Sequence, residues 1–274
     1  IEDIDALSFP KRDLVDLGRY STPGTVMASR GCPFKCRFCA ASAMSGGNYR
    51  MRSVPDILAE VDYLVEDLKC TYITFLDDTI TAFPKVTRSL CEHFLEKSYK
   101  VNWCCESRVD VVDKEMLTLM NKAGCSFIQF GFESGAPKIL ESMGKMISPE
   151  QMETSVKLCT ELGIKSTGNF LIGFPDETKE TVNQTITMVR KLISLGAQIQ
   201  LSVLTPFPGT YYYNHREELG ITLHTEDWDD FHIGYPIIST PNFSCDEIRE
   251  IYFDHFPETK VPGWNLGNRA VPQG

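Results

Sequence analysis

Strand and helix signals alternate along this chain between residues 25 and 204, and this alternation is the strongest constraint on its fold. Short apolar runs typical of buried strands are separated by stretches in which apolar residues recur at helical spacing. A strand, a covering helix and a further strand in this order form a parallel sheet, so the alternation predicts an α/β protein. Six such steps are too few for an eightfold barrel of about 250 residues and favour a partial (β/α)6 TIM-like barrel.

Capping and turn residues set the expected boundaries. Ser148-Pro149-Glu150-Gln151 is a capping box with proline at the first helical position, and this helix should end at Gly163. The expected strands are Thr25–Arg30, Tyr72–Leu76, Val101–Arg108, Ser126–Phe132, Ile164–Ile172 and Gln198–Leu204. The other expected helices are one capped by Ser53 that runs to Leu68, and Pro84–Glu96, Lys114–Ala123 and Lys179–Ser194.

The chain is expected to have three parts: a linker-like N-terminal segment (1–22), the barrel core (23–210) and a C-terminal extension (211–274) that covers the barrel. The last part follows a Pro206-Phe207-Pro208-Gly209 turn and should contain a helix capped at Ser244. Met143 and Met146, which flank a Gly-Lys turn in the core part, are expected to be buried.

Charge and hydropathy exclude several classes of protein. The 27 Lys and Arg residues against 37 Asp and Glu give a net charge of −10, without the basic cluster that nucleic-acid binding needs. No apolar run reaches the roughly 18 to 20 residues of a membrane span, and the first residues lack the features of a secretory signal. A chain this long does not need disulfide staples, so its ten cysteines favour a reducing, cytoplasmic setting.

Three cysteines lie close together directly after the first expected strand. Cys32, Cys36 and Cys39 fall within the segment Arg30-Gly31-Cys32-Pro33-Phe34-Lys35-Cys36-Arg37-Phe38-Cys39, and ten scattered cysteines would give such a triplet with an expectation of about 0.01. Structural zinc needs four ligands, and no fourth cysteine or histidine is nearby in sequence. Three local thiolates therefore predict an iron–sulfur cluster with one open iron, while zinc with a distant fourth ligand remains the alternative.

This cysteine spacing resembles the signature of the radical S-adenosylmethionine (SAM) superfamily. The resemblance implies that Cys32, Cys36 and Cys39 bind a [4Fe–4S] cluster, whose remaining iron is chelated by the amino and carboxylate groups of SAM. It also assigns Phe38 to the aromatic position whose backbone meets the adenine. The fold that the resemblance implies is the same partial barrel that the alternation predicts.

Motifs at the ends of the expected strands resemble those of radical SAM enzymes associated with cobalamin. By this resemblance Asp77 and Asp78 stand where many members have Gly-Gly-Glu and receive the SAM amino group; a solvated loop is the alternative. Arg108 and Glu133, which end the third and fourth strands, would lie near the SAM carboxylate or ribose. An ion pair between these two residues with a purely structural role is the alternative there.

The fifth and sixth strands extend the same resemblance. The segment Gly168–Thr178 is similar to the motif that passes under the adenine, which implies cofactor contacts for Asn169 and Ile172. The segment Leu204–Gly209 resembles the sixth-strand end and proline-rich turn of the same subgroup, which implies a cofactor contact for Leu204 as well. No residue is assigned a catalytic role. Cys104 and Cys105 lie side by side on the third strand, so alternation turns one thiol toward the barrel interior.

The implied activity is reductive cleavage of SAM to a 5′-deoxyadenosyl radical, which abstracts hydrogen from a small-molecule or peptidic substrate. The segment Ile4–Leu14 resembles the linker that follows a cobalamin-binding domain in this subgroup, which implies cobalamin, methyl transfer or a related carbon-centred reaction, and a natural polypeptide that is longer at its N-terminus. A reductant such as flavodoxin or ferredoxin is implied as the partner.

Other functions remain open. A radical SAM oxidoreductase or lyase, or a methylthiotransferase-like enzyme, would act without cobalamin. An iron–sulfur or zinc protein with a structural or electron-carrying role is the non-enzyme alternative, but such a carrier does not need six strands with charged residues at their carboxyl ends.

Overall fold

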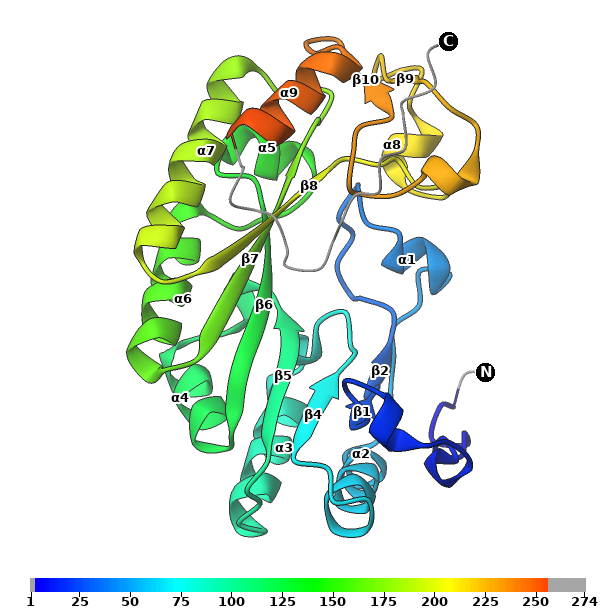
Figure 1. The fold of residues 1–274 in the computed structure, drawn as a ribbon, viewed down its shortest axis with the longest axis vertical. Coiled ribbons are helices and arrows are strands. Elements are labelled where there is room, and N and C mark those ends of the chain that lie inside the picture. The colour runs from blue at the N-terminus through cyan, green and yellow to red at the C-terminus, as the bar shows by residue number, and fades with distance from the viewer. Residues whose placement is uncertain (1–2, 256–274) are drawn as a thin grey trace.

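Six parallel strands form one curved sheet, and the rest of the chain is arranged around it (Figure 1). The structure is a computed structural model and describes residues 3–255. The strand order β1-β4-β5-β6-β7-β8 follows the chain, and each neighbouring pair is parallel, which confirms the partial TIM-like barrel. The strands of this sheet are β1 Thr25–Val26, β4 Tyr72–Phe75, β5 Asn102–Ser107, β6 Cys125–Glu133, β7 Lys165–Ile172 and β8 Gln198–Val203.

Helices cover the outer, convex face of this sheet, as the crossover connections require (Figure 1). A helical segment, Tyr63–Asp67, continues α2, and the short helices α1 and α5 follow β2 and β6. The short helix α1 Ala41–Met44 lies apart from this helical layer, on the other side of the sheet (Figure 1). The other helices before β8 are α2 Val54–Asp62, α3 Pro84–Glu96, α4 Lys114–Lys122, α5 Pro137–Ser142, α6 Pro149–Leu162 and α7 Lys179–Ser194.

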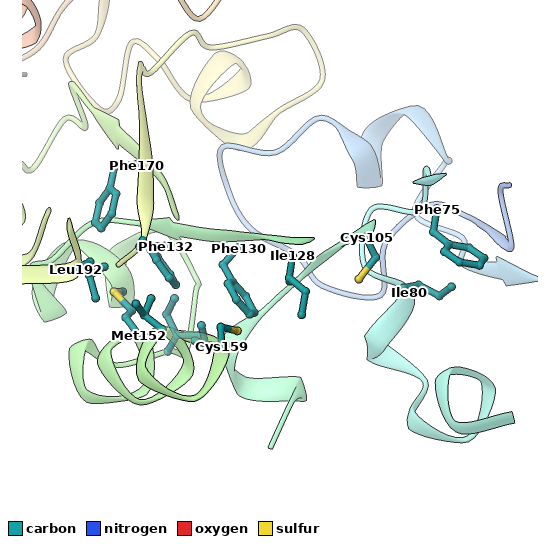
Figure 2. Close-up of a cluster of buried hydrophobic side chains, with 14 of the residues drawn as sticks. Phe75, Ile80, Cys105, Ile128, Phe130, Phe132, Met152, Cys159, Phe170 and Leu192 are labelled. Carbon is teal, nitrogen blue, oxygen red and sulfur yellow. The ribbon is translucent and has the colours of Figure 1, made fainter. Parts of the chain in front are cut away.

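The main core lies between the sheet and these helices. Ile128, Phe130 and Phe132 alternate along β6, are fully buried, and point toward Met152 and Cys159 of α6 (Figure 2). The rings of Phe130 and Phe132 are stacked with centroids 5.8 Å apart. Because successive residues of a strand face opposite sides, the residues between them face the concave interior of the barrel.

Most expected boundaries are confirmed. Helices α3 and α7 have the expected bounds, and α6 opens with the expected capping box and ends before Gly163, which takes a left-handed conformation. The expectation of one strand over Thr25–Arg30 was wrong. Its first half, β1, pairs with β4, whereas β2 (Ser29–Arg30) turns away to pair antiparallel with β3 (Arg50–Met51).

The residues after β8 form smaller elements beside the carboxyl end of the sheet. Ser244 and Glu247 cap α9 with reciprocal hydrogen bonds, as expected. The expectation for Met143 is confirmed, but Met146 is 76% exposed, so that expectation was wrong. These elements are α8 Tyr211–Asn214, β9 Thr222–Leu223, β10 Ile238–Ser239 and α9 Cys245–His255.

The proposed division into parts at residues 22 and 210 remains a prediction, and residues 1–2 and 256–274 of its outer parts lie outside the described residues. Within residues 3–255 we find no helix with the length and apolar character needed to cross a membrane.

Candidate functional site

The segment with three cysteines, residues 31–39, is here called the thiol loop. It follows β2, whose pairing with β3 anchors the base of the loop outside the barrel sheet. Gly31 opens the loop with a φ of 86°, and a Cβ atom there would lie only 2.6 Å from the carbonyl oxygen of Asn48. Glycine is therefore the residue that lets the chain turn here.

Two side chains from the barrel reach the thiols, all three of which are half-buried. The Arg108 guanidinium, directly after β5, donates from Nη1 to the Cys36 sulfur over 3.5 Å. The Cys32 sulfur lies 3.9 Å from the Thr79 hydroxyl, which follows β4. The structure thus brings the thiol loop to the carboxyl ends of the barrel strands, where barrel sites are built.

The ionisation of the thiols is governed by burial and by neighbouring cations. Burial raises the pKa of Cys36, while the positive charges of Lys145 and Arg108 oppose this rise. Burial also raises the pKa of Cys39, to about 11. Since iron binds the thiolate, the two cations favour the form of Cys36 that a metal requires.

Arg108 is held in place by contacts on two sides. Its Nε and Nη2 atoms donate to the two carboxylate oxygens of Asp110 over 2.9 and 2.8 Å. Its guanidinium also lies over the ring of Phe34 in the thiol loop, 3.9 Å from the ring centroid. Arg108 therefore forms its ion pair with Asp110, and the Arg108–Glu133 ion pair that was the alternative does not form.

Glu133 pairs instead with Lys145, which sequence reasoning missed. Lys145 Nζ donates to Glu133 Oε1 over 2.7 Å, and both side chains are less than a tenth exposed. Glu133 has a φ of 66°, a left-handed conformation that costs energy for a residue with a side chain. Such strain at the carboxyl end of β6, beside a buried ion pair, is typical of functional sites.

The acidic pair after β4 is divided between two environments. Asp77 is buried, and its carboxylate accepts hydrogen bonds from the Ala28 backbone and the Ser29 hydroxyl. Asp78 is exposed, and partial burial raises its pKa. Asp77 therefore ties the segment after β1 to β4, while Asp78 is left free to bind a ligand.

Glu106 is a second carboxylate that sequence reasoning did not assign. It lies two residues before Arg108, so alternation along the strand places both on the concave side. Burial raises its pKa, and the negative charges of Asp78 and Glu133 raise it further. Cys104, Glu106 and Arg108 follow one another at intervals of two residues, and this spacing is the signal that would have placed Glu106 in the site.

The residues expected near the adenine lie in the thiol loop, within β7, and at the ends of β7 and β8. Phe38 contacts Phe174, which follows β7, edge to face with ring centroids 6.3 Å apart. Asn169 is half-buried, and its Oδ1 atom is buried without a hydrogen-bond partner. Ile172 and Leu204 are buried apolar residues, joined by a backbone hydrogen bond of 2.8 Å.

Glu177 fixes the turn that carries Phe174. Its Oε2 atom accepts hydrogen bonds from the backbone N–H groups of Gly173 and Phe174, over 2.7 and 3.3 Å. Its side chain is fully buried, which raises its pKa to about 7. Glu177 thereby holds the turn that presents Phe174 to Phe38.

The donor set suits a cluster bound through sulfur. Within residues 3–255, no three His, Cys, Asp or Glu side chains lie in an arrangement that would hold a single metal ion. A [4Fe–4S] cluster makes a different demand, because each of its thiolates binds a different iron atom. Three thiols on one loop, with a cation donating to the middle one, fit that demand.

Comparisons with known proteins show the family to which the sequence is similar. A family model described as the radical SAM superfamily matches residues 26–189. An uncharacterized methyltransferase of Pyrococcus horikoshii is 33% identical over 269 residues, which are 95% of this chain and 58% of the relative. The bacteriochlorophyllide d C-12(1)-methyltransferase of Chlorobaculum tepidum is 30% identical over 220 residues, which are 78% of this chain and 46% of the relative.

A solved structure shares the fold. The radical S-adenosylmethionine methyltransferase TsrM from Kitasatospora setae, with cobalamin and a [4Fe–4S] cluster bound, superposes with a TM-score of 0.66 at 22% identity. The match covers 84% of this chain and 43% of that chain. The chain thus spans about half the length of the relatives it matches.

Proposed function

The chain belongs to the radical SAM superfamily, and from this membership we propose that it functionalises a carbon–hydrogen bond of a small-molecule or peptidic substrate. It is an enzyme of the radical SAM type, a class whose cofactors are a [4Fe–4S] cluster and SAM. When bound, these cofactors supply a 5′-deoxyadenosyl radical that takes a hydrogen atom from the substrate. The observation that carries the proposal is the thiol loop at the carboxyl ends of the strands, with Arg108 donating to Cys36.

Cys32, Cys36 and Cys39 would hold the cluster. Arg108 and Lys145 place positive charge beside Cys36, which compensates the negative charge that three thiolates bring to a half-buried loop. Phe34 stacks on Arg108 and covers its guanidinium. These residues therefore supply the ligands, neutralise charge and limit the access of water.

Charged groups around the mouth would orient SAM. Asp78 is an exposed carboxylate suited to an ammonium group, and a charge-assisted hydrogen bond of this kind is short and strong. Arg108 and the Glu133–Lys145 pair offer donors and acceptors for the carboxylate and the ribose hydroxyls. Asn169, with its unpaired Oδ1 atom, and the ring of Phe38 lie where the adenine is proposed to bind.

Single substitutions test this placement of SAM. Asp78→Ala, Arg108→Ala and Glu133→Ala should each weaken SAM binding by about 1.5 to 3 kcal/mol, the range for one hydrogen bond to a charged group. Anaerobic equilibrium dialysis with labelled SAM measures the affinity, and iron content checks that the cluster persists. Glu161→Ala, on the outer helix α6, is the control. Unchanged affinity in all three variants would mean that SAM binds elsewhere.

We further propose that the reaction is a methyl transfer or a related carbon-centred reaction, and that a cobalamin domain precedes residue 1 in the natural polypeptide. The methyltransferase names of the relatives and the linker-like segment Ile4–Leu14 support this proposal. The full-length gene product should show corrin absorbance and give a methylated product. An initiator methionine directly before Ile1, no bound corrin and an unmethylated product would favour an oxidoreductase or lyase.

The reductant and the substrate belong to the same proposal. A low-potential donor such as flavodoxin or ferredoxin would deliver the electron. The acidic chain suits a small or peptidic substrate better than RNA, which separates this proposal from a methylthiotransferase-like function.

A further inference from the structure

The backbone of Arg37, inside the thiol loop, is held from two sides. Its N–H group donates to the carbonyl oxygen of Met143 over 2.9 Å, and its carbonyl oxygen accepts from the N–H group of Tyr211 over 3.1 Å. Met143 follows α5 in the barrel, whereas Tyr211 is the first residue of α8, after the last barrel strand. One residue between two cluster ligands therefore touches both the barrel and the segment that follows it.

The Arg37 side chain repeats this double contact. Its Nη1 atom donates to the carbonyl oxygen of Ser142 over 2.8 Å, at the end of α5. Its guanidinium carbon lies 4.6 Å from the centroid of the Tyr211 ring, within the range of a cation–π contact. Backbone and side chain thus connect the same two elements, so the arrangement is not a single chance contact.

We propose that Arg37 is a positioning residue that couples the C-terminal extension to the thiol loop. The two hydrogen bonds hold the peptide groups on either side of the Arg37 Cα atom, and these groups set the directions in which the Cys36 sulfur and the Phe38 ring leave the backbone. A shift of α8 would move the Arg37 backbone, and with it one proposed cluster ligand and the ring that contacts Phe174. The contacts of Arg37 are present in the protein without a cluster. Only their effect on cluster binding rests on the proposed function.

Coupling of this kind is reciprocal. If docking of α8 stabilises the loop in the conformation that binds iron, then binding of the cluster must stabilise the docking of α8 by the same factor. The proposal therefore predicts an effect at Tyr211 when the loop is changed, and an effect at the loop when Tyr211 is changed.

The chain offers a matched set of variants. Arg37→Ala removes the guanidinium contacts, and Arg37→Lys keeps the cation over the ring and should restore part of the effect. Tyr211→Ala removes the ring but keeps the N–H group, whereas Tyr211→Pro removes both at a first helical position, where proline is tolerated. Lys35→Ala changes an exposed cation of the same loop whose side chain takes no part in these contacts.

Amide hydrogen exchange of the metal-free protein tests the coupling by itself. Exchange at the Tyr211 amide should be about fivefold faster in Arg37→Ala, the factor expected for loss of the cation–π contact between the guanidinium and the Tyr211 ring. Exchange across residues 32–39 should rise in Tyr211→Pro more than in Tyr211→Ala. Lys35→Ala should match the wild type. Wild-type exchange at both places in all variants would overturn the proposal.

The protein reconstituted with iron and sulfide tests whether Arg37 and Tyr211 affect how firmly the cluster is held. After anaerobic reconstitution, a chelator should remove iron several-fold faster from Arg37→Ala and Tyr211→Pro than from the wild type and Lys35→Ala, and the Tyr211 amide should exchange more slowly with the cluster than without it. Equal rates of iron loss from all four proteins would overturn the coupling. A wild-type protein that takes up no iron would instead refute the proposed function and leave the exchange result standing.

Discussion

The two faces of the central sheet differ in what they bury. On the outer face, side chains such as Ile128 and Phe130 are fully enclosed by helices and have no polar groups to satisfy (Figure 2). On the concave face, Glu106 exposes a carboxylate near the negative charges of Asp78 and Glu133, and the Asn169 Oδ1 atom is buried without a hydrogen-bond partner. Apolar burial stabilises a fold without directional requirements, whereas unpaired polar groups cost stability unless a ligand uses them. The outer face therefore maintains the barrel, and the concave face is available for chemistry.

Substitutions at two neighbouring residues of β6, one on each face of the sheet, should show the largest difference in stability. Phe130→Ala should lower the free energy of unfolding by about 3 to 5 kcal/mol, because it opens a cavity against α6. Gln129→Ala, on the concave side, should change it by less than about 0.5 kcal/mol. Denaturant unfolding under anaerobic conditions measures both. Similar losses at the two positions would contradict the division of roles.

Glu177 gives an effect that depends on pH. Its pKa in the folded protein, about 7, lies above the ordinary value of 4.5, so the native state keeps this proton to higher pH than the unfolded chain. Its contribution is fully present below about pH 4.5 and is lost as the pH rises through about 7, a change of at most about 3 kcal/mol. Glu177→Gln should therefore lose less stability than the wild type between about pH 5 and about pH 8.

Denaturation midpoints at the two pH values measure this difference. Glu161→Gln, an exposed residue of α6, is the control and should follow the wild type. If the stability of the wild type changes across this range by the same amount as that of Glu177→Gln, the carboxyl group is ionised without cost and the prediction is wrong.

Substitutions at two adjacent cysteines of β5 compare the two faces of the sheet with the same residue type, and their effects on stability should be the smallest. Cys105 is buried among the outer core residues, whereas Cys104 is half-buried, with its thiol 3.6 Å from the Thr74 hydroxyl. Cys105→Ser should cost about 1 to 3 kcal/mol because it buries a hydroxyl in apolar surroundings, and Cys104→Ser less than about 0.5 kcal/mol. Thermal unfolding of the two variants checks this order, and the reverse order would mean that the faces are assigned wrongly.

The same division explains what the sequence could predict. The outer face and its helices depend on local signals, namely periodicity, the capping box at Ser148 and the left-handed Gly163, and these elements formed where expected. The split of Thr25–Arg30 into two strands was not predictable in this way, because it depends on which strand each half pairs with.

The site was only partly accessible to sequence reasoning. The thiol loop carries its own spacing signal, but the different environments of Asp77 and Asp78 arise from contacts with Ala28 and Ser29, far away in sequence. Lys145 has no local motif. Its N–H group, in the turn after α5, donates to the carbonyl oxygen of Leu140 within α5. This bond brings the Lys145 side chain back to Glu133, where it is buried.

We propose that Cys32, Cys36 and Cys39 bind one [4Fe–4S] cluster, with which this enzyme would cleave SAM. The most direct measurement is anaerobic reconstitution of the wild type and of Cys39→Ala, followed by iron and sulfide analysis and by mass spectrometry of the nucleosides formed from SAM. We expect about four iron and four sulfide per wild-type chain, with formation of 5′-deoxyadenosine, and we expect Cys39→Ala to lose both the cluster and this product. Stoichiometric zinc in the wild type, with no visible absorbance and no nucleoside product, would contradict this proposal.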